Sequence, residues 1–115
     1  MSAVGVSVRG MAVFAVTVVQ GPAWDPAVGR REQDGWDEHA AFLDGLVADG
    51  RVILGGPVGD GTDVLLAVEA TDEDDLRAAF AADPWLADGT LALGLIQPWQ
   101  LWLDSRTGPV AAGPG

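Results

Sequence analysis

Hydrophobic residues along the chain follow two different spacings, one typical of β-strands and one typical of α-helices. Four short segments are rich in leucine or β-branched residues and are bounded by Gly, Pro or Asp, which predicts strands over residues 11–20, 51–54, 63–69 and 91–103. Two further segments carry apolar side chains three and four positions apart, which predicts amphipathic helices over residues 36–47 and 71–83. The predicted order is therefore β-α-β-β-α-β.

This order is that of an α+β, ferredoxin-like domain, in which a four-stranded antiparallel sheet carries both helices on one face. The other face of the sheet would stay bare in a single chain. Two copies packed face to face would bury it as a dimeric α/β barrel. A slightly positive mean hydropathy in so acidic a chain favours apolar surface hidden by a second subunit, with a larger ordinary core as the alternative. We expect a homodimer.

A length of 115 residues suits one domain with a modest core, which we place at residues 11–103. Residues 1–10 precede the first predicted strand, and Met11 is a candidate alternative start. Residues 104–115 are rich in Gly, Pro and Ala. Because both ends lack periodicity, we expect them to be flexible and dispensable for folding.

The only histidine of the chain lies in the middle of the apolar stripe of the first predicted helix. Around His39 on a helical wheel this stripe contains Trp36, Ala40, Phe42, Leu43, Leu46 and Val47. A buried polar group without a hydrogen-bond partner costs about 1–3 kcal/mol. The imidazole therefore needs a partner from elsewhere in the chain.

A matching polar residue continues the apolar stripe of the second predicted helix. Asp83 follows Leu76, Ala79 and Phe80 at helical spacing, and Pro84 ends the helix there. A buried carboxylate needs a donor, so we predict that Asp83 and His39 are hydrogen-bonded at the edge of a pocket. The alternative is that Asp83 caps the short turn formed by residues 84–89.

Turn residues are dense in residues 55–62, which predicts a hairpin between the second and third strands. Gly55 and Gly56 either let a backbone or ligand approach closely or supply turn geometry. They form neither a dinucleotide-binding nor a P-loop fingerprint. We expect Thr71 to cap the second helix, and Pro98 to mark an edge or a bulge because it cannot donate a ladder hydrogen bond.

Residues 21–35 form a predicted loop of about fifteen residues, a length more often functional or mobile than accidental. Trp24, Arg30 and Arg31 can cover a pocket there and pair with an anionic ligand group. The alternative is a solvated loop in which Trp24 is simply anchored on the core.

The amino-acid composition argues against several kinds of site and partner. The chain has no Cys, which excludes disulfides, thiolate nucleophiles and Cys-based zinc sites, and a single His argues against a histidine-rich metal site. A net charge of −11 argues against nucleic acid and anionic membranes as partners. We expect a cytoplasmic protein that binds a small molecule and holds neither a metal nor a bound cofactor.

Five short motifs follow one another along the chain: His39 in the first helix, Asp49-Gly50, Gly55-Gly56-Pro57, Asp83-Pro84-Trp85 and Pro98-Trp99. Together they resemble the YCII-related (YciI-like) family over about residues 11–103. The resemblance implies a ferredoxin-like dimeric α/β barrel with a His–Asp active site, which would be His39 and Asp83 here. Many relatives have an Arg three residues before the histidine. Trp36 takes that position in this chain, which predicts a more apolar pocket.

Two functions fit these residues. The first is a cofactor-independent acid/base enzyme of lyase, dehalogenase or isomerase type, which acts on a small cyclic or aromatic metabolite through a His–Asp pair. A characterised branch of the family removes chloride from a chlorinated hydroxylated aromatic ring. The second is a non-catalytic ligand-binding or structural dimer. The candidate substrate contacts are Trp24, Arg30, Arg31, Trp36, Gly56, Pro57 and Trp85.

Overall fold

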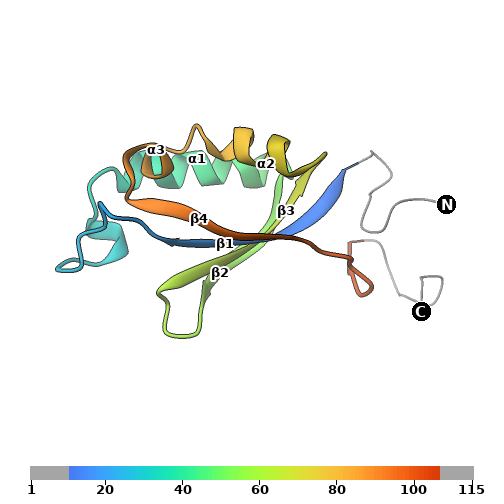
Figure 1. The fold of residues 1–115 in the computed structure, drawn as a ribbon, viewed down its shortest axis with the longest axis horizontal. Helices are drawn as coiled ribbons and strands as arrows, with labels where there is room; N and C mark the ends of the chain where they lie inside the picture. Colours follow the sequence, from blue (N-terminus) through green and yellow to red (C-terminus); the bar gives the residue numbers. More distant parts are fainter. Residues whose placement is uncertain (1–10, 107–115) are drawn as a thin grey trace.

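The predicted element order is present in the computed structural model of the protein, which describes residues 11–106 (Figure 1). The strands are β1 (Ala12–Gln20), β2 (Val52–Val58), β3 (Asp63–Ala70) and β4 (Leu91–Pro98). The helices are α1 (Trp36–Ala48), α2 (Glu73–Phe80) and the short α3 (Pro84–Asp88), and a 3-10 turn, η1 (Arg30–Glu32), precedes α1. The ferredoxin-like α+β fold is thus confirmed, with α3 added between α2 and β4. The segments 1–10 and 107–115 lie outside the described residues.

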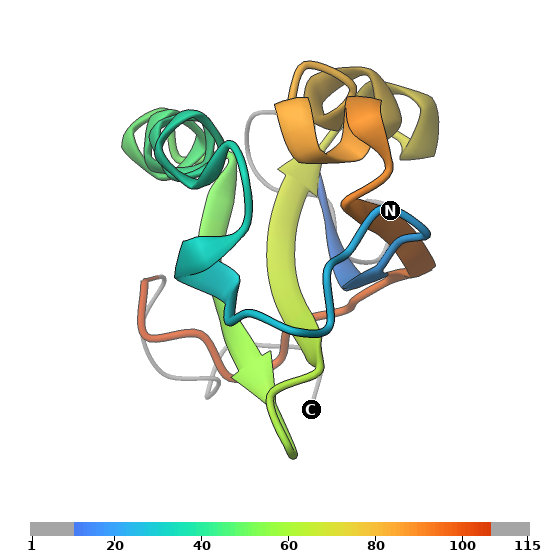
Figure 2. The ribbon, with the colours of Figure 1, turned by 90° about the vertical axis from the view of Figure 1, so that its left-hand side faces the viewer.

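The strands form one antiparallel sheet in the order β2-β3-β1-β4, with β1 and β3 at its centre. Helices α1, α2 and α3 all cover the same face of this sheet (Figures 1 and 2). Figure 2 shows α1 side by side with the α2–α3 pair above the strands. Among the helices of residues 11–106, none has the length and apolar character needed to cross a membrane.

The core lies between the helices and the sheet, because alternate residues of each strand point toward the helical layer. In β1 these residues are Phe14, Val16 and Val18, all buried. They belong to one core cluster with Leu76 and Phe80, the two buried residues of α2. The apolar residues that alternate along β1 and those at helical spacing in α2 therefore pack in the same cluster.

Val47 does not belong to this packing, contrary to its place on the predicted apolar stripe of α1. Its side chain is 56% exposed, whereas its neighbour Leu46 packs against the core. The sheet covers a narrower stripe of α1 than the width of the apolar arc in the sequence.

The predicted N-cap of the second helix is wrong by one residue. Asp72, not Thr71, caps α2, because the Asp72 side chain accepts a hydrogen bond from the backbone N–H of Asp75 at 2.8 Å. Thr71 instead donates its own backbone N–H to the Asp75 carboxylate at 2.9 Å. Two carboxylates therefore bind backbone donors at this end of the helix.

The predicted turn after Leu54 is also wrong, since β2 continues through Gly55, Gly56 and Pro57 to Val58. β2 is an edge strand, where the missing N–H of a proline is best tolerated. A side chain at Gly55 would collide with Leu66 of β3, so this glycine serves close packing of the sheet. Nothing lies within 4 Å of the position that a Cβ of Gly56 would take.

The last strand is shorter than predicted. β4 ends at Pro98, at the sheet edge as expected, and Trp99 donates a final backbone hydrogen bond to Val13. The chain then leaves the ladder, so Leu101–Leu103 do not resume the strand. Because Trp99 donates toward β1, the N–H that Pro98 lacks would point away from β1, to the open side of this edge strand, where a proline is tolerated. Farther along, the guanidinium of Arg106 pairs with Asp104 and with Glu69 of β3.

Candidate active site

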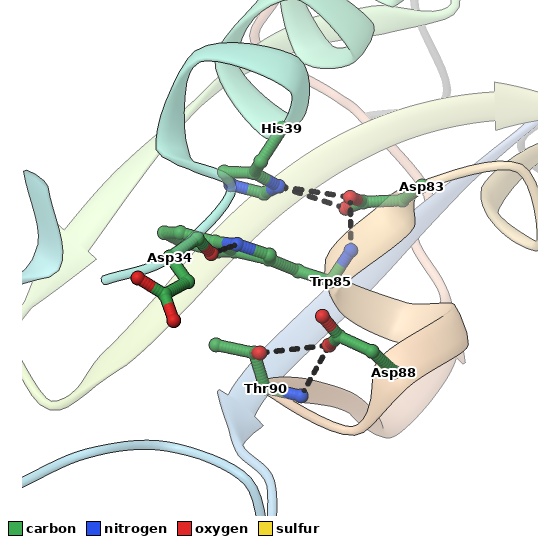
Figure 3. A network of polar contacts seen from close by, with 6 residues as sticks. All are labelled: Asp34, His39, Asp83, Trp85, Asp88 and Thr90. Atoms are coloured by element: carbon green, nitrogen blue, oxygen red, sulfur yellow. Dashed lines mark hydrogen bonds and ion pairs between the residues drawn. The ribbon is translucent and has the colours of Figure 1, made fainter.

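His39 and Asp83 meet in the interior although they lie 44 positions apart in the sequence (Figure 3). The Nδ1 atom of His39 lies 3.0 Å from each carboxylate oxygen of Asp83. Both residues are buried, with 4% and 2% of their surfaces exposed. Because an ionised carboxylate can only accept, a neutral His39 carries its proton on Nδ1 and donates it to Asp83.

The Asp83 carboxylate is oriented by its own helix. Its Oδ1 atom accepts the backbone N–H of Trp85 at 3.0 Å and so caps the first turn of α3. Pro84 occupies the first position of α3 and favours the extended backbone found at Asp83, with ψ of 121°. Both roles considered for Asp83, the partner of His39 and the cap, therefore occur together.

The indole of Trp85 fixes the plane of the imidazole. The two rings are stacked, with centroids 4.0 Å apart and planes inclined by 11°. Trp85 is fully buried, and its Nε1–H donates to the backbone carbonyl of Asp34 at 2.7 Å (Figure 3). This bond joins α3 to the residues just before α1, so His39 is held by Asp83 at its edge and by Trp85 on its face.

The second ring nitrogen of His39, Nε2, stays accessible. It makes no hydrogen bond to any described residue. Within residues 11–106, however, every fully buried side-chain nitrogen or oxygen has a partner. The small exposed part of the ring therefore includes Nε2. In the neutral tautomer set by Asp83, this atom carries the free lone pair.

A cavity of about 380 Å³ opens beside the His39–Asp83 pair, and both residues line it. Most of its wall is apolar and comes from β1, β3, β4 and all three helices: Val18, Leu43, Val64, Leu66, Phe80, Leu86 and Leu91. Four of the residues that the sequence marked for ligand contact also line it: Arg30, Trp36, Gly56 and Pro57. The cavity is thus a mainly apolar chamber with one imidazole, one guanidinium and the carboxylates of Asp44 and Asp83 at its wall.

The family model of the YCII-related domain matches residues 14–100, which include all of the sheet except the first two residues of β1, both residues of the pair and the entire cavity wall. The chain belongs to the YCII-related domain family. No curated protein matches the sequence at a significant level.

Three other candidate residues of this YCII-related domain lie behind the cavity wall rather than in it. Trp85 is buried under His39, and Trp24 contacts the Trp85 ring edge-on with centroids 6.2 Å apart. The guanidinium of Arg31 lies over the ring of Trp36, 5.4 Å from its centroid, and its side chain is exposed. Trp24 and Trp85 therefore support the imidazole from behind, whereas Arg31 lies outside the cavity.

Sequence reasoning missed two contributors to the site of this YCII-related domain. Asp44 lines the cavity one helical turn beyond Ala40, a spacing that the helical wheel could have indicated. Gln33 is buried in the loop before α1, where its side chain binds backbone atoms of Asp25 and Val28. No periodic signal marks a loop glutamine, so Gln33 could not have been found from the pattern.

Proposed function

We propose that this YCII-related domain is an acid/base enzyme that moves a proton on a small cyclic or aromatic metabolite, with His39 as the base. The observation that carries this proposal is the orientation of the imidazole. Nδ1 is bound to both oxygens of Asp83, and Nε2 is accessible beside an apolar cavity. A base must reach the proton that it removes, and this arrangement leaves Nε2 free to do so.

The chemistry follows from the two ring nitrogens. Nε2 takes a proton from a C–H or O–H group of the substrate, and the ring becomes an imidazolium. Asp83 stabilises that charge through the Nδ1–H bond, and the stacked Trp85 ring stabilises it through its π face. The proton then returns to another atom of the substrate, as in an isomerase, or a leaving group departs, as in a lyase or dehalogenase. Such proton transfer contributes about 10²–10⁴-fold to a rate.

The size and lining of the cavity support a single-ring substrate. A volume of about 380 Å³ falls at the lower end of the range for small-molecule sites. The apolar walls bind the hydrocarbon part, and a bound ring displaces water from Nε2, the accessible atom of a His39 that is otherwise 96% covered. An apolar chamber of this kind also strengthens the electrostatic interaction between the imidazolium and Asp83.

The test is deuterium exchange from D2O into a panel of cyclic ketones, lactones and phenols, followed by mass spectrometry. Wild type should exchange at least one member. His39→Gln should abolish the exchange, and Asp83→Asn should lower it by about 10²-fold or more. Asp72→Asn makes the same change at the cap of α2, outside the cavity wall, and should leave the rate unchanged.

Equal exchange rates in wild type, His39→Gln and Asp83→Asn would refute the proposed acid/base activity. Panel members that bind but never exchange would point instead to a non-catalytic ligand-binding protein.

We also propose that the protein is a homodimer that packs the bare sheet face of one copy against that of another. Leu54 pairs with Ala67 across β2 and β3, and both residues line a shallow hollow with Leu65, Val58 and Trp99. None of them belongs to the helix-side core cluster, and Leu54 is 64% exposed in the single chain. An apolar patch of this kind marks a protein interface more often than a free surface.

Sedimentation equilibrium at micromolar concentration should give twice the chain mass. Leu54→Asp should dissociate the dimer, because it would bury an unpaired charge in the interface. Val47→Asp, an equally drastic change on the exposed side of α1, should not. A monomeric wild type would exclude this assembly.

A further inference from the structure

Within residues 11–106, the arginines divide into two groups by their partners. Arg51, Arg77 and Arg106 each form an ion pair with an acidic side chain. Arg30 and Arg31 have no carboxylate within 4.0 Å among residues 11–106, although the chain is strongly acidic. Only Arg30 of these two lines the cavity beside His39. An unpaired cation at the wall of an apolar chamber is the feature that calls for explanation.

The loop holds Arg30 in place by contacts that leave its hydrogen-bond donors almost unused. Gln33 ties residues 25–33 together with three hydrogen bonds to backbone atoms. The Arg30 guanidinium lies over the ring of Trp24, 5.2 Å from its centroid, and its Nη2 atom is 3.5 Å from the carbonyl of Gly61. A cation over a ring is attracted through its charge, and a 3.5 Å contact is weak. The guanidinium therefore keeps most of its five N–H donors for a ligand.

Burial of the Arg30 guanidinium is not offset inside the protein. The side chain is half-buried, and this desolvation lowers its pKa, with no neighbouring acid acting in the opposite direction. Two carboxylates do line the same cavity. Asp83 is bound to His39, and Asp44 is exposed to solvent, so its charge is screened. An anionic group bound at Arg30 would pair the guanidinium without displacing either of them.

We propose that Arg30 binds a carboxylate of the substrate, so that the cavity takes a small cyclic or aromatic carboxylic acid as its anion. This inference rests on the proposed function and specifies its substrate class. The planar fork of the guanidinium matches the two oxygens of a carboxylate, which fixes the orientation of the ring as well as its affinity. The ring lies against the apolar wall, with its reacting atom toward Nε2 of His39. The position three residues before His39 is occupied by Trp36, which carries no charge. Arg30 therefore supplies a cation to the pocket from the loop.

The test compares two probes of the same shape, benzoate and the uncharged benzamide, titrated into the full chain and followed by calorimetry. Wild type should bind benzoate at least about tenfold more tightly than benzamide, as a charge-assisted hydrogen bond predicts. Arg30→Gln should weaken benzoate binding by about 10- to 100-fold and leave benzamide nearly unaffected. Arg30→Lys should recover only part of the preference, because an ammonium cannot form the fork.

Arg31→Gln is the matched control, since it removes the adjacent charge at a residue that does not itself line the cavity. It should change both affinities by less than about twofold. An equal loss in Arg31→Gln and Arg30→Gln would overturn the proposal, because general charge attraction would then explain binding. A wild type that does not prefer benzoate, or binds neither probe at millimolar concentration, would overturn it as well.

His39→Gln separates this inference from the proposed function. It should retain the preference for benzoate while abolishing deuterium exchange. Loss of exchange without loss of preference supports both statements, whereas a preference that never depends on Arg30 overturns the substrate class alone.

Discussion

Asp83 performs two tasks with one carboxylate, and substitutions can separate them. Asp83→Ala removes the cap of α3, which costs about 0.5–2 kcal/mol. It also leaves the buried Nδ1–H of His39 without an acceptor, which costs about 1–3 kcal/mol. The free energy of unfolding should therefore fall by about 1.5–5 kcal/mol. Urea denaturation measures this loss directly.

Asp83→Asn should behave differently, because the amide oxygen can still accept the backbone N–H of Trp85. Its NH2 group would then replace Oδ2, one of the two oxygens that lie 3.0 Å from Nδ1, while Oδ1 stays bound to the backbone N–H of Trp85. Two donors cannot face each other, so the neutral His39 ring should transfer its proton to Nε2 and accept from the amide through Nδ1. Stability should fall by less than about 2 kcal/mol, but Nε2 loses its lone pair and can no longer act as a base.

The assay is nitrogen-15 NMR of the imidazole, which distinguishes a protonated ring nitrogen from a bare one. The chain has one histidine, so the signals need no assignment. Spectra are compared at a pH where titration shows the ring to be neutral. Asp72→Asn should give the wild-type spectrum, since it changes only the cap of α2. A wild-type proton on Nε2, or a spectrum of Asp83→Asn identical to that of wild type, would refute this account of the pair.

Two further predictions concern stability. Gly45→Ala should stabilise the protein by about 0.5–1 kcal/mol, because Gly45 lies inside α1 with open space around the position of a Cβ. Gly21→Ala should destabilise the protein, because a Cβ there would collide with the backbone of Gly89. Equal melting temperatures for the two variants would contradict this description of the packing. Hydrogen bonds from the backbone N–H of Thr71 and the guanidinium of Arg51 hold the pKa of the Asp75 carboxylate below its ordinary value of 3.8. The ionised carboxylate therefore stabilises the fold above pH 3.8, and this stabilisation is lost as the pH falls through the lowered pKa. Asp75→Asn should therefore lower stability by up to about 1 kcal/mol at pH 7, and the difference in urea denaturation from wild type should shrink below pH 3.8; a difference that persists at lower pH would exclude the carboxylate as its cause.

The sequence predicted the parts of the fold that depend on periodicity. The apolar alternation of β1 and the helical spacing around His39 are strong local signals. His39 and Asp83 each interrupt an apolar stripe with a polar side chain, which indicated that each needs a hydrogen-bond partner. Element ends were less predictable. Asp72 rather than Thr71 caps α2 because its carboxylate accepts the N–H of Asp75, while the carboxylate of Asp75 accepts the N–H of Thr71. β2 includes Pro57 because an edge strand tolerates a proline.

The cavity wall was predictable only in part, because it depends on how distant elements pack. Trp36 lines the chamber from the face predicted for α1. Trp85 looked equally suited to touch a ligand, yet it lies under the imidazole. Which aromatic residue faces the chamber and which one supports His39 is set by the position of α3, and no local pattern encodes that position.

One consequence of α3 concerns how new specificities can arise on this scaffold. The five residues from Pro84 to Asp88 present the cap at Asp83 and the indole of Trp85 as one small rigid unit, and the indole is anchored to Asp34 just before α1. Gly56 and Pro57 line the same chamber but belong to a different element, β2. Mutations there can change the shape of the chamber while the geometry of the His39–Asp83 pair is inherited intact. Gly56 offers the clearest opening for such drift, since a side chain added there meets no atom within 4 Å.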